Sequence, residues 1–374
     1  MRNFKRTVVI LAVAVCLLLL LDFALYPCTF MRNDIHAVTT AGYDDIYLGT
    51  SHGKMGIDPA SVEEVTGRTG HNVCVGGEYC VDVYHLARLI LEKGEKPKRI
   101  IFELSPDYLI TEKEEGNNYL LFYHEFPLSM TKLAYFQAAI AKTNLRTVFF
   151  PWYEYALSYE LDHAGETIRK KWTKDFGVDS FVTDTQEYHE NGFIERFPID
   201  TDTLDPEELE EYYIPYPEDL LETNMKYMEK LVELCRENGI ELVALVTPVP
   251  QVTMDYFYDG YQELDAYFEE YFGERDVRYI NFNTDFYYEY ATHDLTDFTD
   301  LDGHLNGDAA RAFSAQLARV LDLPQEKWEV WGSYEEPEES DEDWEDEDWE
   351  DEDWEEDSED WEEEDWEEDE DTLG

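Results

Sequence analysis

Short apolar runs alternate with longer amphipathic stretches along most of this chain. The runs are almost continuously apolar, which is typical of parallel strands buried on both faces. We predict five strands, at Asp45–Gly49, Asn72–Val75, Arg99–Leu104, Glu241–Val246 and Val277–Phe282. The longer stretches place their apolar residues on one helical stripe. We predict four helices, at about Val81–Lys93, Pro217–Asn238, Gly260–Phe272 and Gly307–Leu321.

This alternation predicts the α/β fold class. We expect a doubly wound, flavodoxin-like parallel sheet of about five strands with helices on both faces, within a domain at 28–334. The segment at about 105–216 interrupts the alternation and is rich in Tyr, Phe and acidic residues, so we interpret it as a large aromatic-rich insertion. Such a segment can be a lid or substrate wall, or a helical subdomain without substrate contact. The sequence leaves both interpretations open.

The first 27 residues predict a membrane anchor. Three cations within the first six residues precede an uncharged apolar run at 7–21, and residues 23–26 extend it past Asp22. Roughly 20 apolar residues span a bilayer, and cations on the amino-terminal side place the remainder of a chain outside the cytoplasm. A cleaved signal peptide is the alternative, but bulky Phe23, Leu25 and Tyr26 follow the run where small residues would mark a cleavage site. We therefore expect an uncleaved single-pass anchor in the cell membrane.

Charge changes this picture at the carboxyl terminus. The net charge is −60, and residues 335–374 contain 29 acidic side chains and no Lys or Arg. Removing them leaves 88 − 29 = 59 acidic against 28 basic residues, so the rest of the chain carries about −31. The negative charge of both parts of the chain excludes nucleic acid as a binding partner, because binding nucleic acid requires a basic surface. We expect a disordered acidic tail that offers its carboxylates to divalent cations or a basic partner. Tryptophans recur in it, at Trp344, Trp349, Trp354, Trp361 and Trp366.

Cofactor and metal motifs are absent from the sequence. There is no P-loop, no Gly-x-Gly-x-x-Gly and no Cys-x-x-Cys, and the histidines lack ligand spacing, so we expect no cofactor and no metal. The five cysteines do not form a disulfide framework. Buried free thiols, with at most one bridge between Cys74 and Cys80, are the expected arrangement.

Chemistry-bearing residues follow the first predicted strand and precede the last predicted helix. Gly49-Thr50-Ser51 ends the strand, and Asp300, Asp302 and His304 lie in a late loop. A serine becomes a nucleophile when a histidine takes its proton and a carboxylate orients that histidine. Each residue also has an ordinary interpretation, because serine commonly caps helices and the histidine follows an Asp-Gly turn.

Together these motifs resemble the SGNH (GDSL-type) hydrolase superfamily, in particular its membrane-anchored bacterial branch that acts on cell-envelope polymers, as in polysaccharide O-acetylation and teichoic-acid D-alanylation. Gly49-Thr50-Ser51 is similar to the first block of this family, and Leu305-Asn306-Gly307 to the sequence after its histidine. The resemblance covers roughly 40–110 and 217–323. It implies Ser51 as nucleophile and His304 as base.

The resemblance also assigns supporting roles. The envelope branch often has Asp-x-His, so Asp302 is the expected orienting carboxylate, and Asp300 is the alternative if the loop bends. The oxyanion donors would be the amides of Ser51 and of Gly76 or Gly77. The wider family's Gly-x-Asn-Asp block is missing, because the fourth strand ends at Thr247-Pro248.

The implied function is that of an extracytoplasmic serine esterase or O-acyltransferase that acts on a cell-surface polysaccharide or a teichoic-acid-like polymer. The alternative is a non-catalytic envelope scaffold, or a helper of a membrane O-acyltransferase complex, whose acidic tail binds cations or partners.

Overall fold

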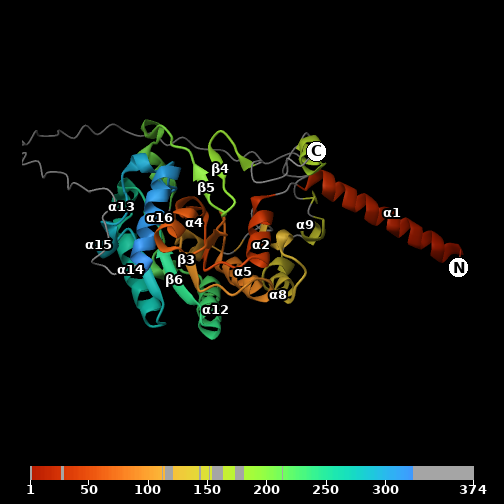
Figure 1. The fold of residues 1–374 in the computed structure, drawn as a ribbon, viewed down its shortest axis with the longest axis horizontal. Helices are drawn as coiled ribbons and strands as arrows, with labels where there is room; N and C mark the ends of the chain where they lie inside the picture. Colours follow the sequence, from red (N-terminus) through yellow and green to blue (C-terminus); the bar gives the residue numbers. More distant parts are fainter. Residues whose placement is uncertain are drawn as a thin grey trace, which may run out of the picture. The chain divides into compact units, whose positions relative to one another are not determined.

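The chain forms a parallel sheet covered by helices (Figure 1). The computed structural model describes residues 2–26, 29–111, 113, 121–142, 145–150, 152–153, 163–172, 181–212 and 214–322. The predicted acidic tail at 335–374 lies outside the described residues.

Five parallel strands make the main sheet, in the order β2-β1-β3-β6-β7. Their bounds are β1 Asp45–Leu48, β2 Gly70–Asn72, β3 Arg99–Glu103, β6 Glu241–Val246 and β7 Arg278–Asn281. The prediction of an α/β fold with five strands is therefore confirmed, and the strand order is compatible with a doubly wound fold. The second strand ends earlier than predicted. Hydrogen bonds from Val73 to Tyr47 and from Val75 to Gly49 nevertheless extend its pairing with β1.

Successive strand residues face two separate hydrophobic cores, which is why most residues of β1, β3 and β6 are apolar. On one face, Leu48 and Phe102 pack against α2, α5, α12 and α14, whereas on the other face Tyr47 and Ile101 pack against α4 and α16. The bounds of these helices are α2 Phe30–Thr40, α4 Pro59–Thr66, α5 Cys80–Lys93, α12 Glu222–Asn238, α14 Tyr258–Gly273 and α16 Gly307–Asp322. Helices thus cover both faces of the sheet (Figure 1).

Shorter elements connect these layers. The remaining helices are α3 Ser51–Gly56, α6 Asp107–Ile110, α7 Leu121–Glu125, α8 Met130–Ala138, α9 Leu145–Phe149, α11 His163–Trp172, α13 Gln251–Tyr256 and α15 Asp285–Tyr288. The 3-10 turns are Ile140–Lys142, Thr201–Thr203, Pro206–Glu211, Pro217–Asp219 and Leu295–Asp297. A separate antiparallel pair is formed by β4 Gln186–Tyr188 and β5 Ile194–Arg196.

The middle of the chain is described in part. Between β3 and α12 the structure contains α6–α9, α11 and the β4–β5 hairpin, and α8 packs on α5. The interpretation of this stretch as one aromatic-rich insertion stays a prediction.

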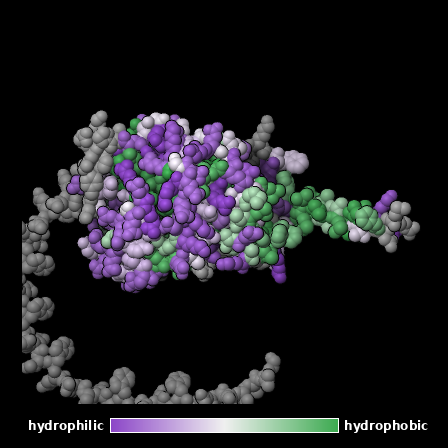
Figure 2. All heavy atoms as spheres, turned by 90° about the horizontal axis from the view of Figure 1, so that it is seen from below, coloured by the Kyte–Doolittle hydropathy of each residue, from purple (hydrophilic) through white to green (hydrophobic). Residues whose placement is uncertain are grey.

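The amino-terminal helix α1, Arg2–Leu25, is long and apolar enough to cross a membrane over Phe4–Leu25. None of its residues in that window is buried inside the protein, and Figure 2 displays it as a hydrophobic rod. Length and composition make α1 a candidate membrane span or signal anchor.

The thiols of Cys74, Cys80 and Cys235 are free and buried, and the thiol of Cys16 is free and exposed in α1. Cys28 lies outside the described residues. Cys74 and Cys80 therefore do not form the disulfide bridge that the sequence left open.

Candidate active site

Ser51 lies directly after β1 because the chain turns sharply at Gly49. This glycine has a φ of +144°, and a Cβ at this position would lie 2.6 Å from the backbone oxygen of Glu103. Only glycine fits such a conformation and such a close approach. Thr50 then caps α3, and Ser51 is the first residue of that helix. Ser51 is therefore placed at the carboxyl edge of the sheet, and the neighbouring threonine supplies the cap.

Two buried carboxyl groups hold this turn. Glu103, the last residue of β3, accepts hydrogen bonds from Thr50 N–H at 2.6 Å and Thr50 Oγ1 at 2.9 Å. Glu78 accepts one from Gly49 N–H at 3.2 Å. Burial raises the pKa of both side chains. The backbone groups next to Ser51 are thus satisfied within the core rather than by water.

Ser51 and His304 meet although 253 positions separate them in the sequence. Ser51 Oγ lies 2.8 Å from His304 Nε2, and His304 Nδ1 lies 2.8 Å from Asp300 Oδ2. With Nδ1 protonated, the imidazole donates to Asp300 and accepts from the serine hydroxyl. The expected convergence of Ser51, His304 and one aspartate at hydrogen-bond distance is confirmed.

The aspartate that bonds His304 is Asp300 rather than the preferred Asp302. Asp302 Oδ2 is 4.0 Å from His304 Nδ1 and makes no hydrogen bond with it. The loop bends because Asp300 Oδ1 accepts from the backbone N–H groups of Gly303 and His304, each at 3.1 Å, and Gly303 has a φ of +113°. The preference for Asp302 as hydrogen-bond partner was therefore wrong, since sequence spacing does not record this turn.

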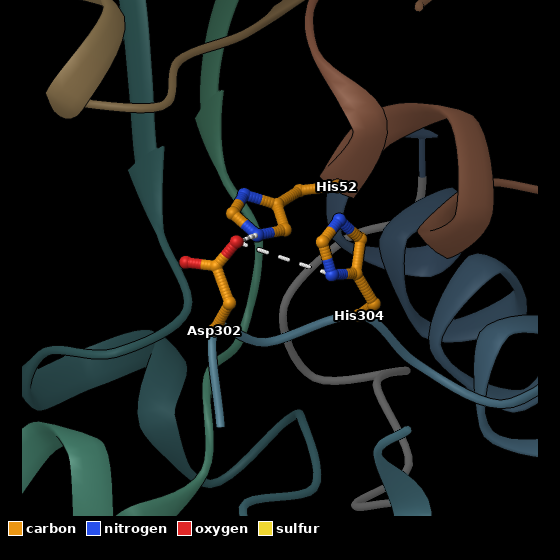
Figure 3. A group of neighbouring side chains, drawn as sticks. All are labelled: His52, Asp302 and His304. Carbon is orange, nitrogen blue, oxygen red and sulfur yellow. Dashed lines mark ion pairs between the residues drawn. The ribbon is translucent and has the colours of Figure 1, made fainter. Parts of the chain in front are cut away.

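Asp302 pairs instead with His52. Asp302 Oδ2 lies 3.3 Å from His52 Nε2, and the rings of His52 and His304 lie 4.5 Å apart between centroids. Figure 3 shows Asp302 facing His52, with His304 beside them. Each of the two adjacent imidazoles thus has its own carboxylate partner from the same loop.

The site keeps both carboxylates ionised. Burial by itself raises the pKa of Asp300, but the hydrogen bonds and charge of His304 outweigh it, so the pKa is lowered. For Asp302, burial is likewise outweighed by the charge and hydrogen bond of His52, and the pKa falls to about 2. An ionised Asp300 can stabilise an imidazolium at His304, which is the function of the carboxylate in a serine triad.

The predicted oxyanion donors lie on two neighbouring turns. No acceptor for the Ser51 N–H exists among the described residues. Gly76 and Gly77 belong to a turn in which Glu78 N–H donates to Val75 O at 3.1 Å, and Val75 N–H donates to Gly49 O, which attaches the turn to β1. Gly77 has a φ of +76°. Their role as oxyanion donors stays a prediction.

A cavity of about 420 Å³ opens beside the histidines. It is lined by His52 and Asp302 and by residues at the carboxyl ends of β3 and β6. The ends of the middle segment also line it, through Ser105, Pro106, Tyr108, Ile110 and Thr111 and through Tyr212 and Ile214. Its aromatic lining consists of Tyr108, Tyr212, Phe257 and Tyr261. Parts of the middle segment therefore border the site, as the interpretation as a substrate wall requires.

Two side-chain groups in the described part of the chain have donor atoms close enough for a metal ion: His52, Asp302 and His304, and Glu187, His189 and Glu195. In the first group, Asp300 and Ser51 already occupy the two ring nitrogens of His304. In the second group, Glu195 forms an ion pair with Arg311. These contacts favour acid–base chemistry over coordination at the first group.

Sequence patterns did not identify Glu78 or Glu103 as parts of this site. Glu103 ends an apolar strand, which is an unusual place for an unpaired acid, and this was the one available signal. Comparison with known proteins adds no family, because neither a family model nor a curated protein matches the chain.

We predict that Glu103→Ala destabilises the fold and disturbs Ser51. The change leaves a buried N–H and a hydroxyl of Thr50 without an acceptor, which costs about 1–3 kcal/mol of unfolding free energy. Glu103→Gln keeps an acceptor oxygen in the same place and is the matched control. Urea unfolding of the detergent-solubilised chain measures both variants. Equal stability of the two variants would show that the hydrogen bonds to Thr50 do not stabilise the turn.

We also predict a pH-dependent contribution from the His52–Asp302 pair. Because the fold lowers the pKa of Asp302 from 3.8 to about 2, its contribution to stability is complete above the ordinary value and disappears as the pH falls through that interval. The melting temperatures of the wild type and of Asp302→Asn should therefore differ at neutral pH and converge on acidification. A constant difference down to the acid end would contradict the pairing.

Proposed function

We propose that this chain is a membrane-anchored serine esterase or O-acyltransferase that forms an acyl-enzyme at Ser51. One observation carries the proposal, namely the continuous hydrogen-bonded series Ser51 Oγ–His304 Nε2–His304 Nδ1–Asp300 Oδ2, with both distances at 2.8 Å. The order nucleophile, base and orienting carboxylate is the arrangement that activates a serine hydroxyl.

In the first half-reaction, Ser51 Oγ attacks the carbonyl carbon of an ester while its proton moves to His304 Nε2. The resulting oxyanion is stabilised by N–H donors, for which the Ser51 amide and those of Gly76 or Gly77 are the candidates. The C–O bond to the alcohol then breaks, and the alcohol leaves with the proton from His304. Asp300 stays ionised and stabilises the imidazolium between these two proton transfers.

In the second half-reaction, a water or a sugar hydroxyl attacks the acyl-enzyme, with its proton taken by the same imidazole. Hydrolysis and transfer differ only in this acceptor. The cavity beside His52 supports an acceptor with a ring, because aromatic side chains such as Tyr108 and Tyr212 offer faces on which a sugar can stack.

The proposed substrate is a cell-surface polysaccharide or a teichoic-acid-like polymer outside the cytoplasm. Support comes from the apolar helix α1, the cations before it and the resemblance of the Gly49-Thr50-Ser51 and His304 blocks to the envelope branch of SGNH hydrolases. A membrane O-acyltransferase as acyl donor and partner belongs to the same proposal.

We predict that a serine-directed fluorophosphonate probe labels the full chain at Ser51. The Ser51→Ala variant should lose the label, together with the slow hydrolysis of a small aryl acetate, because within the described part of the chain Ser51 is the hydroxyl that bonds His304 Nε2. Ser61→Ala, a serine substitution in α4, is the matched control and should keep both activities. Labelling that persists in Ser51→Ala would instead favour the non-catalytic scaffold.

The two aspartates should differ in their effect on turnover. Asp300→Asn removes the carboxylate that accepts from His304 Nδ1 and should lower kcat by up to the order of 10⁴-fold, as the equivalent change does in a serine triad. Asp302→Asn alters the partner of His52 and should cost much less. The measurement is kcat for aryl acetate hydrolysis by the two variants. A larger loss of kcat in Asp302→Asn than in Asp300→Asn would show that Asp302 orients His304.

A further inference from the structure

The end of α1 is surrounded by helices from the middle of the chain. Tyr26 OH donates to Glu125 of α7 at 2.8 Å, and Lys171 of α11 donates to the carbonyl oxygen of Phe23 at 2.9 Å. The backbone of Trp152 donates to the carboxyl group of Asp22. These contacts attach α7, α11 and the segment after α9 to the point where the candidate membrane span ends.

Helices α8, α9 and α11 and the loop between α7 and α8 expose large apolar side chains. Their exposed members are Leu128 (89%), Met130 (70%), Leu133 (56%), Leu145 (45%), Phe149 (64%), Ile168 (38%) and Trp172 (82%). We call these seven residues the collar. Figure 2 shows hydrophobic surface that continues from α1 onto the adjoining part of the body. Contiguous exposed apolar surface of this kind marks an interaction site.

The stretch 121–172, in which the collar lies, is close to neutral. Its cations are Lys132, Lys142, Arg146, Arg169, Lys170 and Lys171, and its acids are Glu125, Glu154, Glu160, Asp162 and Glu166. Over the complete stretch 121–172 the count is six cations against five acids, a net charge of +1. The chain outside the tail carries about −31 (59 acidic against 28 basic residues), and neither this stretch nor residues 1–101, with 11 basic and 11 acidic residues, shares that net negative charge.

We propose that the collar docks on the surface of the bilayer that α1 crosses, with its apolar side chains in the interface and the neighbouring cations Arg146, Arg169 and Lys170 near lipid phosphates. Exposed Trp and Phe next to Lys and Arg are the composition of interfacial segments. A basic side chain close to an anionic leaflet contributes attraction that neutral protein surface does not. Continuity with α1 identifies the occupant as lipid, because Asp22–Tyr26 would lie at the outer edge of the hydrocarbon core.

This docking rests on α1 as a membrane span, which belongs to the proposed function, and is independent of the chemistry at Ser51. It would fix the body relative to the membrane, whereas an anchor followed by a free linker would leave it mobile.

The test uses the full chain in lipid nanodiscs that contain phosphatidylglycerol. An environment-sensitive fluorophore is attached to one cysteine at a time, in a background with Cys16→Ser and Cys28→Ser, since Cys74, Cys80 and Cys235 are buried. Labels at Trp172→Cys and Leu128→Cys report on the collar. A label at Tyr256→Cys is the control, because Tyr256 is 53% exposed and belongs to α13, outside the collar.

Each labelled protein is compared in ordinary lipid and in lipid with brominated acyl chains, which quenches fluorophores that reach the acyl chains. We expect loss of emission at positions 172 and 128 and unchanged emission at position 256. Both collar positions are highly exposed, so their substitution leaves the core intact, and unchanged melting temperatures verify this.

A label on the native thiol of Cys16, in the Cys28→Ser protein, tests the membrane span separately from the docking of the collar. Quenching at Cys16 without quenching at positions 172 and 128 overturns the docking and leaves the membrane span intact. Absence of quenching at Cys16 overturns the span and the docking together. Quenching at all three positions supports the docking.

Charge reversal provides a second arm. Arg169→Glu combined with Lys170→Glu should reduce quenching at position 128 in anionic nanodiscs, because repulsion from lipid phosphates replaces attraction. Lys98→Glu, at an exposed lysine outside the collar, is the matched control and should leave the quenching unchanged. Equal quenching in the double variant and the control would contradict the role of the cations.

Discussion

The hydrogen bonds from Thr50 to the buried carboxyl group of Glu103 are the constraint on which the candidate site depends. They connect the ends of two neighbouring strands, β1 and β3, at the residue before Ser51. Because both partners lie in the core, the turn cannot relax without leaving a polar group unsatisfied. The position of the Ser51 hydroxyl is thereby coupled to the packing of the whole sheet, and the close approach of Gly49 to Glu103 makes that coupling tight.

The two aspartates of the late loop contact two different histidines. Asp300 turns back to its own loop and accepts from backbone and imidazole at once, whereas Asp302 extends to His52 on α3. Adjacent imidazoles repel each other when both are protonated, and a carboxylate beside each one reduces that repulsion. The pair His52–Asp302 therefore stabilises the surroundings of His304, and it forms a wall of the neighbouring cavity.

The middle segment of the chain contributes to two different places. Its two ends, near Tyr108 and Tyr212, border the cavity, whereas α7, α11 and the segment after α9 contact the end of α1. One segment thus contacts both the substrate-sized cavity and the candidate membrane span. This arrangement is the one that the proposed docking on a bilayer requires.

The sequence alone determined the strand-and-helix alternation, because burial on both faces makes a parallel strand continuously apolar, and it determined that Ser51 and His304 belong to one edge of the sheet. It also located α1, whose composition is sufficient evidence for its apolar character. Tertiary structure decided the rest. Asp300 replaced Asp302 as partner of His304 because the turn at Gly303 reverses the loop, and such a turn depends on packing against Val249 rather than on spacing. Glu78 and Glu103 acquired their roles only when distant strands came together, since a buried carboxyl group is explained by its partner and not by its neighbours in sequence.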